Sequence, residues 1–194
     1  MNRRIVVGIS GASGSPYAHR LLEVLHTGRD EFGVEPHLVF SKPGRMVYQD
    51  ETGFDPRDWD FPIWGPMDMT APFASGSARF ESMVIVPCSA GTLGRVATGT
   101  SINLMSRAAE VMLKERRKLI MVLRESPYSL MHLRNMTSIT EAGGLILPAS
   151  PSFYSVPKNR TELLDTVVSR VLDHLGIDTE LIPRWAGREK GGLR

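Results

Sequence analysis

Residues 4–25 read RIVVGISGASGSPYAHRLLEVL and decide the fold of the chain. The run from Arg4 to Ile9 is short and apolar, which is typical of a strand buried on both faces of a parallel sheet. Ser15 is placed as a helix N-cap and Pro16 as the first helical residue. Apolar residues then recur at helical spacing, at Ala18, Leu21, Leu22 and Leu25. The stretch predicts a strand, a glycine-rich turn and a helix in succession.

The same alternation continues to the end of the chain. Apolar runs predict four further strands, at residues 36–40, 83–87, 119–123 and 145–147. Helical spacing predicts helices over residues 103–117 and 129–141, and a last helix that starts near Asn159 and stops at Gly176. Strands that alternate with helices are typical of an open α/β sheet, here with five or six parallel strands and helices on both faces.

Residues 51–78 are the least regular part of the chain. They hold four prolines and two tryptophans and show no sustained hydrophobic period. A segment of this length without regular structure in a compact domain is usually a functional loop.

Length and composition restrict the class of protein. The chain has 194 residues, 42% of them hydrophobic and 23% charged, with a formal net charge of +2. These values predict a single domain over residues 1–194 and argue against disorder and against a general nucleic-acid-binding surface. The single cysteine excludes an intramolecular disulfide and a multi-cysteine zinc site. No apolar run approaches the roughly 18 residues of a membrane span, so we expect a cytoplasmic location.

The residues directly after the predicted strands are the candidate ligand-binding positions, because open α/β sheets bind ligands at the carboxyl ends of their strands. They are 11–13 (GAS), Ser41, 88–89 (CS) and 124–125 (RE). Small side chains let a planar ligand approach the backbone, and a helix N-terminus offers amides to a phosphate. The turn at 11–14 lacks the third glycine of the dinucleotide fingerprint, so a tight turn without a ligand remains an alternative.

Other candidate residues each allow two interpretations. Cys88 fits a small buried residue better than a nucleophile, since no histidine lies near it in sequence. Arg124 and Glu125 can be a functional pair or an ion pair at the sheet edge. Arg170, just off the apolar stripe of the last helix, can bind phosphate or lie on the surface. Tyr154 can pack or donate a hydrogen bond. The five histidines show no metal-ligand spacing.

Seven segments, in this order and spacing, resemble the UbiX-type flavin prenyltransferases. They are 8–14 (GISGASG), 41–42 (SK), 87–89 (PCS), 107–117 (RAAEVMLKERR), 124–127 (RESP), 132–136 (HLRNM) and 148–154 (PASPSFY). The resemblance extends from residue 5 to about residue 186. The helix end LKERR and the loop PSFY are together its most specific parts.

The resemblance implies a Rossmann-like, flavodoxin-like flavoprotein that joins a dimethylallyl group to reduced FMN. The donor would be dimethylallyl monophosphate, and new bonds would form at flavin N5 and C6. The product would be the prenylated FMN used by UbiD-type decarboxylases. The resemblance also implies a homo-oligomer, typically a dodecamer, whose sites lie between subunits, and no metal, nucleic-acid or membrane partner.

The resemblance also assigns roles to residues of this chain. The residues that would contact FMN are Gly11, Ala12, Ser13, Ser41, Cys88, Ser89, Ala90, Gly91 and Arg124. The residues that would hold the prenyl phosphate are Lys114, Tyr154 and Arg170, with Trp185 helping to close the site. Glu125, Ser13 and Lys114 would be catalytic, with Glu125 near the leaving oxygen. Residues 183–194 would close the site or contact a neighbouring subunit. Relatives more often carry larger residues at 90–91, which puts a side-chain contact from Gly91 in doubt.

Two other functions compete with this one. A flavin-dependent decarboxylase of peptidyl or phosphopantothenoyl cysteine would carry an asparagine in the turn after the third predicted strand and a histidine near residues 60–78. This chain has neither. A non-catalytic FMN-binding protein would not need the cations Lys114, Arg124 and Arg170 around a second phosphate.

Overall fold

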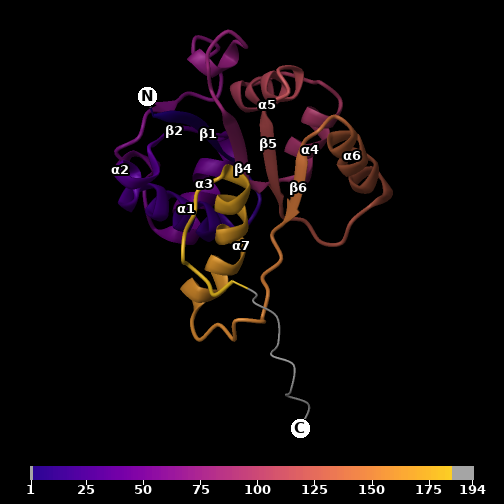
Figure 1. Ribbon diagram of the computed structural model, residues 1–194. Helices are drawn as coiled ribbons and strands as arrows, with labels where there is room; N and C mark the ends of the chain where they lie inside the picture. The colour runs from indigo at the N-terminus through magenta and orange to yellow at the C-terminus, as the bar shows by residue number, and fades with distance from the viewer. Residues whose placement is uncertain (1, 185–194) are drawn as a thin grey trace.

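The computed structural model describes residues 2–184, which form one six-stranded, all-parallel sheet with helices on both faces (Figure 1). The strand order is β3-β2-β1-β4-β5-β6. The strands are β1 (Arg3–Ile9), β2 (Val34–Phe40), β3 (Ile63–Trp64), β4 (Ser82–Cys88), β5 (Lys118–Leu123) and β6 (Leu145–Pro148). The predicted fold class and all five predicted strands are confirmed, and β3 is an additional short edge strand.

The helices cover the sheet in two layers. One face carries α1 (Ser15–Thr27), α3 (Lys42–Thr52) and α7 (Arg160–Leu175), and the short α2 (Arg29–Phe32) lies beside it. The other face carries α4 (Ala90–Ala97), α5 (Leu104–Lys114) and α6 (Leu130–Glu141).

Strand β1 shows why the sheet takes helices on both sides. Ile5, Val7 and Ile9 are fully buried in the core beneath α1 and α7. Val6, on the opposite face, is buried in the core beneath α4 and α5. Burial of each such side chain contributes about 1.5–3 kcal/mol, so a strand that is apolar on both faces is stable only between two layers.

The sequence predictions missed two helices and were wrong at two helix boundaries. Helices α3 and α4 were not predicted at all. Helix α5 ends at Lys114 rather than at residue 117. The chain leaves the helix there because Arg116 takes a left-handed conformation (φ 55°) and the guanidinium of Arg117 turns away to the carbonyls of Gly76 and Ala78, both at 2.7 Å. The second boundary error, at Ser15, concerns the candidate functional site.

The last helix begins and ends as predicted, and a buried ion pair fixes its position. Asn159 caps its N-terminus, and Gly176 ends it in the left-handed conformation (φ 69°) that glycine adopts without strain. Asp165 of α7 is 5% exposed and binds Arg20 of α1 through two hydrogen bonds of 2.7 and 3.2 Å. This bidentate pair holds α7 against α1 and so determines where Arg170 lies.

Part of the segment between α3 and β4 forms a lobe that extends beyond the sheet (Figure 1). The regular parts of the whole segment are two short 3-10 helices, Pro56–Asp58 and Pro72–Ala74, and strand β3, which pairs with β2. The mostly irregular character predicted for residues 51–78 is confirmed. Among residues 2–184, none of the helices is long and apolar enough to cross a membrane.

Candidate functional site

The strands β1, β2, β4 and β5 all end at one edge of the sheet, which we call the carboxyl edge. Helices α1, α3 and α4 begin there. The topology therefore brings together the residues that follow the strands: 11–14, Ser41, 88–91 and 124–125. The prediction that these segments meet is confirmed, because parallel strands share their carboxyl ends.

The turn after β1 is built differently from the prediction. Gly14, not Ser15, is the N-cap of α1, with φ 113°, and no side chain of the turn caps the helix. The carboxylate of Glu51, in the last turn of α3, accepts hydrogen bonds from the amides of Gly14 at 2.9 Å and Ser15 at 2.8 Å. A carboxylate at this place compensates the partial positive charge of the helix N-terminus.

Glu51 is the main residue near this turn that sequence reasoning missed. Burial alone would raise its pKa, but hydrogen bonds from the Ser13 hydroxyl and from the amides of Gly14 and Ser15 outweigh burial and lower the pKa below its usual value. Glu51 is therefore an anion beside Ser13. It also occupies the amides of Gly14 and Ser15, at a helix N-terminus that could otherwise bind a phosphate.

The turn after β2 lies close to the turn after β1. Ser41 caps α3, and its hydroxyl accepts a hydrogen bond from the amide of Gly44 at 2.9 Å. A Cβ atom on Gly11 would lie 2.5 Å from Cβ of Pro43, and one on Gly44 would lie 2.3 Å from the carbonyl oxygen of Ile9. Only glycine at these two positions allows the two turns to approach so closely.

The turn after β4 offers its main chain and Ser89 rather than a thiol. Cys88 is fully buried, and burial raises the pKa of its thiol to about 12, so it remains protonated and unreactive. Any contact of Cys88 with a flavin would have to come from its main chain. Ser89 caps α4. The buried Ser10 hydroxyl donates to the carbonyl of Pro87 at 2.8 Å and accepts from the amide of Ser89 at 2.7 Å, which fixes this turn to β1.

The two charged residues after β5 make different contacts. The amide of Arg124 donates to the carbonyl of Cys88 at 3.0 Å, and its exposed side chain passes close to Gly14. The carboxylate of Glu125 accepts a hydrogen bond from the amide of Ser126 at 3.0 Å. The structure contains no ion pair between Arg124 and Glu125 within residues 2–184, so neither charge is neutralised by the other.

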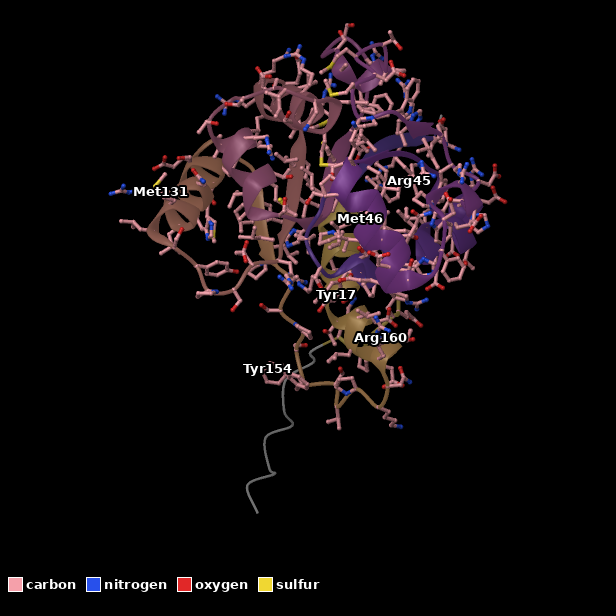
Figure 2. The ribbon with its side chains drawn as sticks, turned by 180° about the vertical axis from the view of Figure 1, so that it is seen from behind. Tyr17, Arg45, Met46, Met131, Tyr154 and Arg160 are labelled. Carbon is pink, nitrogen blue, oxygen red and sulfur yellow. The ribbon has the colours of Figure 1, made fainter. Side chains whose placement is uncertain are left out.

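A cavity of about 880 Å³ lies between α7 and the loops that flank it. Tyr154 and Arg170 both line this cavity. Arg170 donates to Asp173 at 2.7 Å, and Arg184 donates to the same carboxylate at 3.0 Å. Tyr154 is 88% exposed on the loop below the sheet (Figure 2).

Lys114 does not join these residues within one chain. It ends α5, four residues before β5 begins, and so lies at the opposite edge of the sheet, which we call the amino edge. There it forms an ion pair with Glu115 beside Gly76. Trp185 lies outside the described residues.

The carboxyl edge fits a flavin by the chemistry of its residues. Side chains at 11–13 and 89–91 are small, Ser13 and Gly91 are exposed, and Arg124 supplies an exposed guanidinium. The first amides of α4, at Ala90 and Gly91, have no partner within the helix and suit a phosphate.

Comparison with known proteins agrees with this geometry. A family model described as Flavoprotein matches residues 1–174. A protein of Thermoplasma acidophilum named flavin prenyltransferase UbiX is 48% identical, and the match covers 94% of this chain and 99% of that protein. The enzyme of the same name from Pseudomonas aeruginosa is 41% identical over 94% of this chain and 93% of its own length.

Solved structures indicate the same family. The crystal structure of AnUbiX in complex with FMN and dimethylallyl pyrophosphate superposes with a TM-score of 0.90 at 41% identity, over 97% of this chain and all of that one. A dodecameric FMN-dependent UbiX-like decarboxylase from Escherichia coli O157:H7 superposes with a TM-score of 0.89 at 39% identity, over 95% of this chain and all of that one.

More distant structures share only the fold. The FMN-dependent cysteine decarboxylase TvaF, with a TM-score of 0.61, is 16% identical over 91% of this chain and 98% of that one. The competing interpretation as a cysteine-type decarboxylase therefore has no support beyond architecture. With a flavoprotein model matching residues 1–174 and relatives more than 40% identical over nearly the whole chain, the chain belongs to the UbiX-type flavin prenyltransferases.

Proposed function

We propose that this chain transfers a dimethylallyl group from dimethylallyl monophosphate to N5 and C6 of reduced FMN. The proposal rests on two features of the chain: a carboxyl edge of small residues, and a cavity that Arg170 and Tyr154 line. One part suits a planar flavin and the other suits a second phosphate. The close relatives named flavin prenyltransferase, and the AnUbiX complex with FMN and dimethylallyl pyrophosphate, support it.

FMN would lie along the carboxyl edge, held by residues 11–13, Ser41, residues 88–91 and Arg124. Because Glu51 already occupies the amides of Gly14 and Ser15, its negative charge would repel a phosphate there. We place the FMN phosphate at the N-terminus of α4 instead, where the amides of Ala90 and Gly91 are available.

Reduced FMN, when bound, supplies N5 and C6 as the atoms to which the dimethylallyl carbons bond. The chain's own residues act on the leaving group. Arg170 and Tyr154 would bind the phosphate, and Glu125 would give a proton to the phosphate oxygen as its bond to carbon breaks. The proton displaced from N5 would restore Glu125, and the proton displaced from C6 would balance the one added to the donor's double bond. A cation on the phosphate favours departure because negative charge develops on that oxygen. A monophosphate carries less charge than a diphosphate and needs fewer cations.

Lys114 would serve the site of a neighbouring subunit, because it lies at the amino edge of its own sheet. This requires a homo-oligomer, and the described surface carries large exposed apolar side chains on two elements that could meet a second copy: Leu130, Met131 and Leu133 on α6, and Phe153 and Val156 on the loop before α7. Figure 2 shows Met131 directed outward from α6. We propose a dodecamer, as described for the Escherichia coli relative, whose prenylated FMN passes to a UbiD-type decarboxylase in the cytoplasm.

The test is to incubate the purified protein with reduced FMN and dimethylallyl monophosphate and to measure the product mass. A flavin heavier by one C5H8 unit supports the function. Unmodified FMN would indicate a flavin-binding protein without this activity, and release of carbon dioxide from a cysteine-terminated peptide would indicate the decarboxylase.

The placement of Lys114 has its own test. At a donor concentration near the KM of the unchanged enzyme, Lys114→Ala and Arg170→Ala protomers should each have low activity alone. Oligomers that contain both should recover activity at about a quarter of their sites, where one subunit supplies an intact Lys114 and the other an intact Arg170. No recovery would mean that the two residues act within one chain.

A further inference from the structure

A second charged cavity lies at the amino edge of the sheet, where β1, β4 and β5 begin, far from the candidate flavin site. We call it the amino-edge cavity, and its volume is about 670 Å³. Six basic residues line it: Arg3, Arg4, Arg79, Arg116, Arg117 and Lys118. The UbiX-type reaction proposed above uses none of them.

The positive charge of this cavity is mostly uncompensated. Its one acidic lining residue is Glu81, whose carboxylate binds Arg3 at 2.7 and 2.9 Å. Six cations and one carboxylate leave five positive charges. Like charges held together repel one another, so a chain that keeps them in one cavity is stabilised when an anion binds.

Two of the arginines have no role in holding the fold. Within residues 2–184, the side chains of Arg79 and Arg116 make no hydrogen bond or ion pair, and both residues are exposed. Arg117, in contrast, binds the carbonyls of Gly76 and Ala78. Arg116 also has a left-handed backbone (φ 55°), a conformation that costs free energy for a residue with a side chain.

A buried hydroxyl in the same cavity lacks a partner. Ser82, the first residue of β4, is 2% exposed and lines the cavity, and its Oγ makes no hydrogen bond with any of the residues described. A buried hydroxyl without a partner costs about 1–3 kcal/mol. An anionic oxygen bound in the cavity would accept this hydrogen bond and remove that cost.

The cavity favours a chain of phosphates over a single small anion. A volume of this size takes ligands much larger than one phosphate, and five positive charges match several negative ones. Guanidinium groups bind phosphate oxygens in pairs. The ring of Phe80 is covered by Arg4, 4.6 Å from its centroid, and so offers no open face on which a base could stack.

We propose that the amino-edge cavity is a binding site for an oligophosphate chain, free or as the phosphate end of a nucleotide. Ser82, Arg79 and Arg116 contact the phosphate oxygens. The cavity lies at the opposite edge of the sheet from the flavin site of the same chain, and the proposal does not depend on the prenyl-transfer function.

Isothermal titration of the FMN-loaded protein with inorganic tripolyphosphate, at a physiological salt concentration, tests the proposal. We expect one site per chain. The double variant Arg79→Ala/Arg116→Ala should weaken binding at least about tenfold, since each lost charge-assisted hydrogen bond contributes about 1.5–3 kcal/mol. Ser82→Ala should weaken it by a smaller factor, and both variants should keep their FMN.

The matched control is Arg134→Ala/Arg160→Ala, which removes two exposed arginines from α6 and α7 and leaves the net charge the same as in the double variant. The control should bind tripolyphosphate as the unchanged protein does. Equal weakening in both double variants would overturn the proposal, because attraction to the overall charge would then explain binding. Absence of saturable binding would also overturn it.

Titration with ATP distinguishes a free phosphate chain from the phosphate end of a nucleotide. Equal affinity for ATP and tripolyphosphate means that the chain itself is recognised, as the covered Phe80 ring predicts. Binding of ATP alone would overturn recognition of the phosphate chain and indicate a base-binding site. If many protein chains bound to one DNA duplex and tripolyphosphate did not bind, the cavity would be part of a nucleic-acid-binding surface. That result would contradict the proposal.

Discussion

Arg170 and Asp173 lie one helical turn apart on α7, and the guanidinium of Arg170 donates to the carboxylate at 2.7 Å. Both residues line the 880 Å³ cavity that also holds Tyr154. The pair keeps an exposed arginine turned along the cavity wall, where a phosphate would meet it. Arg184 binds the same carboxylate, so the cavity has two guanidinium groups around one acid.

Arg170→Ala should raise the KM for dimethylallyl monophosphate by about tenfold to a hundredfold, because a charge-assisted hydrogen bond to phosphate is lost. The free energy of unfolding should change by less than about 1 kcal/mol, as for other exposed ion pairs at this spacing. Steady-state kinetics and urea unfolding measure the two effects. Arg160→Ala, an exposed arginine on the same helix, is the control. A large loss of stability with an unchanged KM would show that Arg170 serves packing.

Ser13→Leu should remove FMN from the purified protein. Ser13 is exposed between Ala12 and the capped start of α1, and a branched apolar side chain there would fill the space for the flavin and lose the hydrogen bond to Glu51. Flavin absorbance of the purified protein measures occupancy. Ser13→Ala, which removes only the hydroxyl, separates the two effects. A Leu variant that keeps its full FMN content would contradict the placement of the flavin.

Glu51→Gln should destabilise the protein by about 1 kcal/mol at neutral pH, the usual cost of losing a good helix cap. The pKa of Glu51 is lower in the folded protein than its ordinary value of 4.5. The carboxylate therefore stabilises the fold fully above pH 4.5, and this contribution is lost as the pH falls through the lower, folded pKa. The difference in unfolding free energy between the two proteins should shrink below about pH 4.5.

Urea unfolding from neutral pH down to pH 3 would show this trend. Glu141→Gln, on the exposed last turn of α6, is the control and should cost much less. A difference that stays constant over the whole range would mean that the charge of Glu51 does not act on the N-terminus of α1.

The order of elements could be predicted because each strand of this sheet is a short apolar run ended by a turn. Helix α3 could not, because only Gly44 and Tyr48 of its residues are buried and it has no apolar stripe. Helix α4 has eight residues and includes Gly91 and Gly94, which are poor helix formers.

Candidate site residues that directly follow a strand could be predicted from the sequence. Residues that only the fold brings near them could not. Glu51 lies 37 residues from Gly14, at the far end of the unpredicted helix, and no local pattern connects the two. Lys114 was assigned by resemblance alone. Its place at the amino edge follows from the direction of the strands, and for this reason we propose that a neighbouring subunit supplies it.

Glu125 gives the most direct test of the chemistry. It follows the buried strand β5, and its carboxylate is bound only by the amide of Ser126 among the described residues, so one oxygen remains available. Glu125→Gln keeps the shape and can still donate a hydrogen bond to phosphate, but it cannot transfer a proton. Prenylation should slow by about 10²–10⁴, the usual contribution of a general acid, while the affinities for FMN and donor stay the same. Single-turnover measurement of product mass gives the rate, and flavin absorbance and donor titration give the affinities.

Glu141→Gln is again the control, since it makes the same chemical change far from the carboxyl edge. Unchanged turnover in Glu125→Gln would show that Glu125 only positions the turn after β5, and the proton for the leaving phosphate would then have to come from another group.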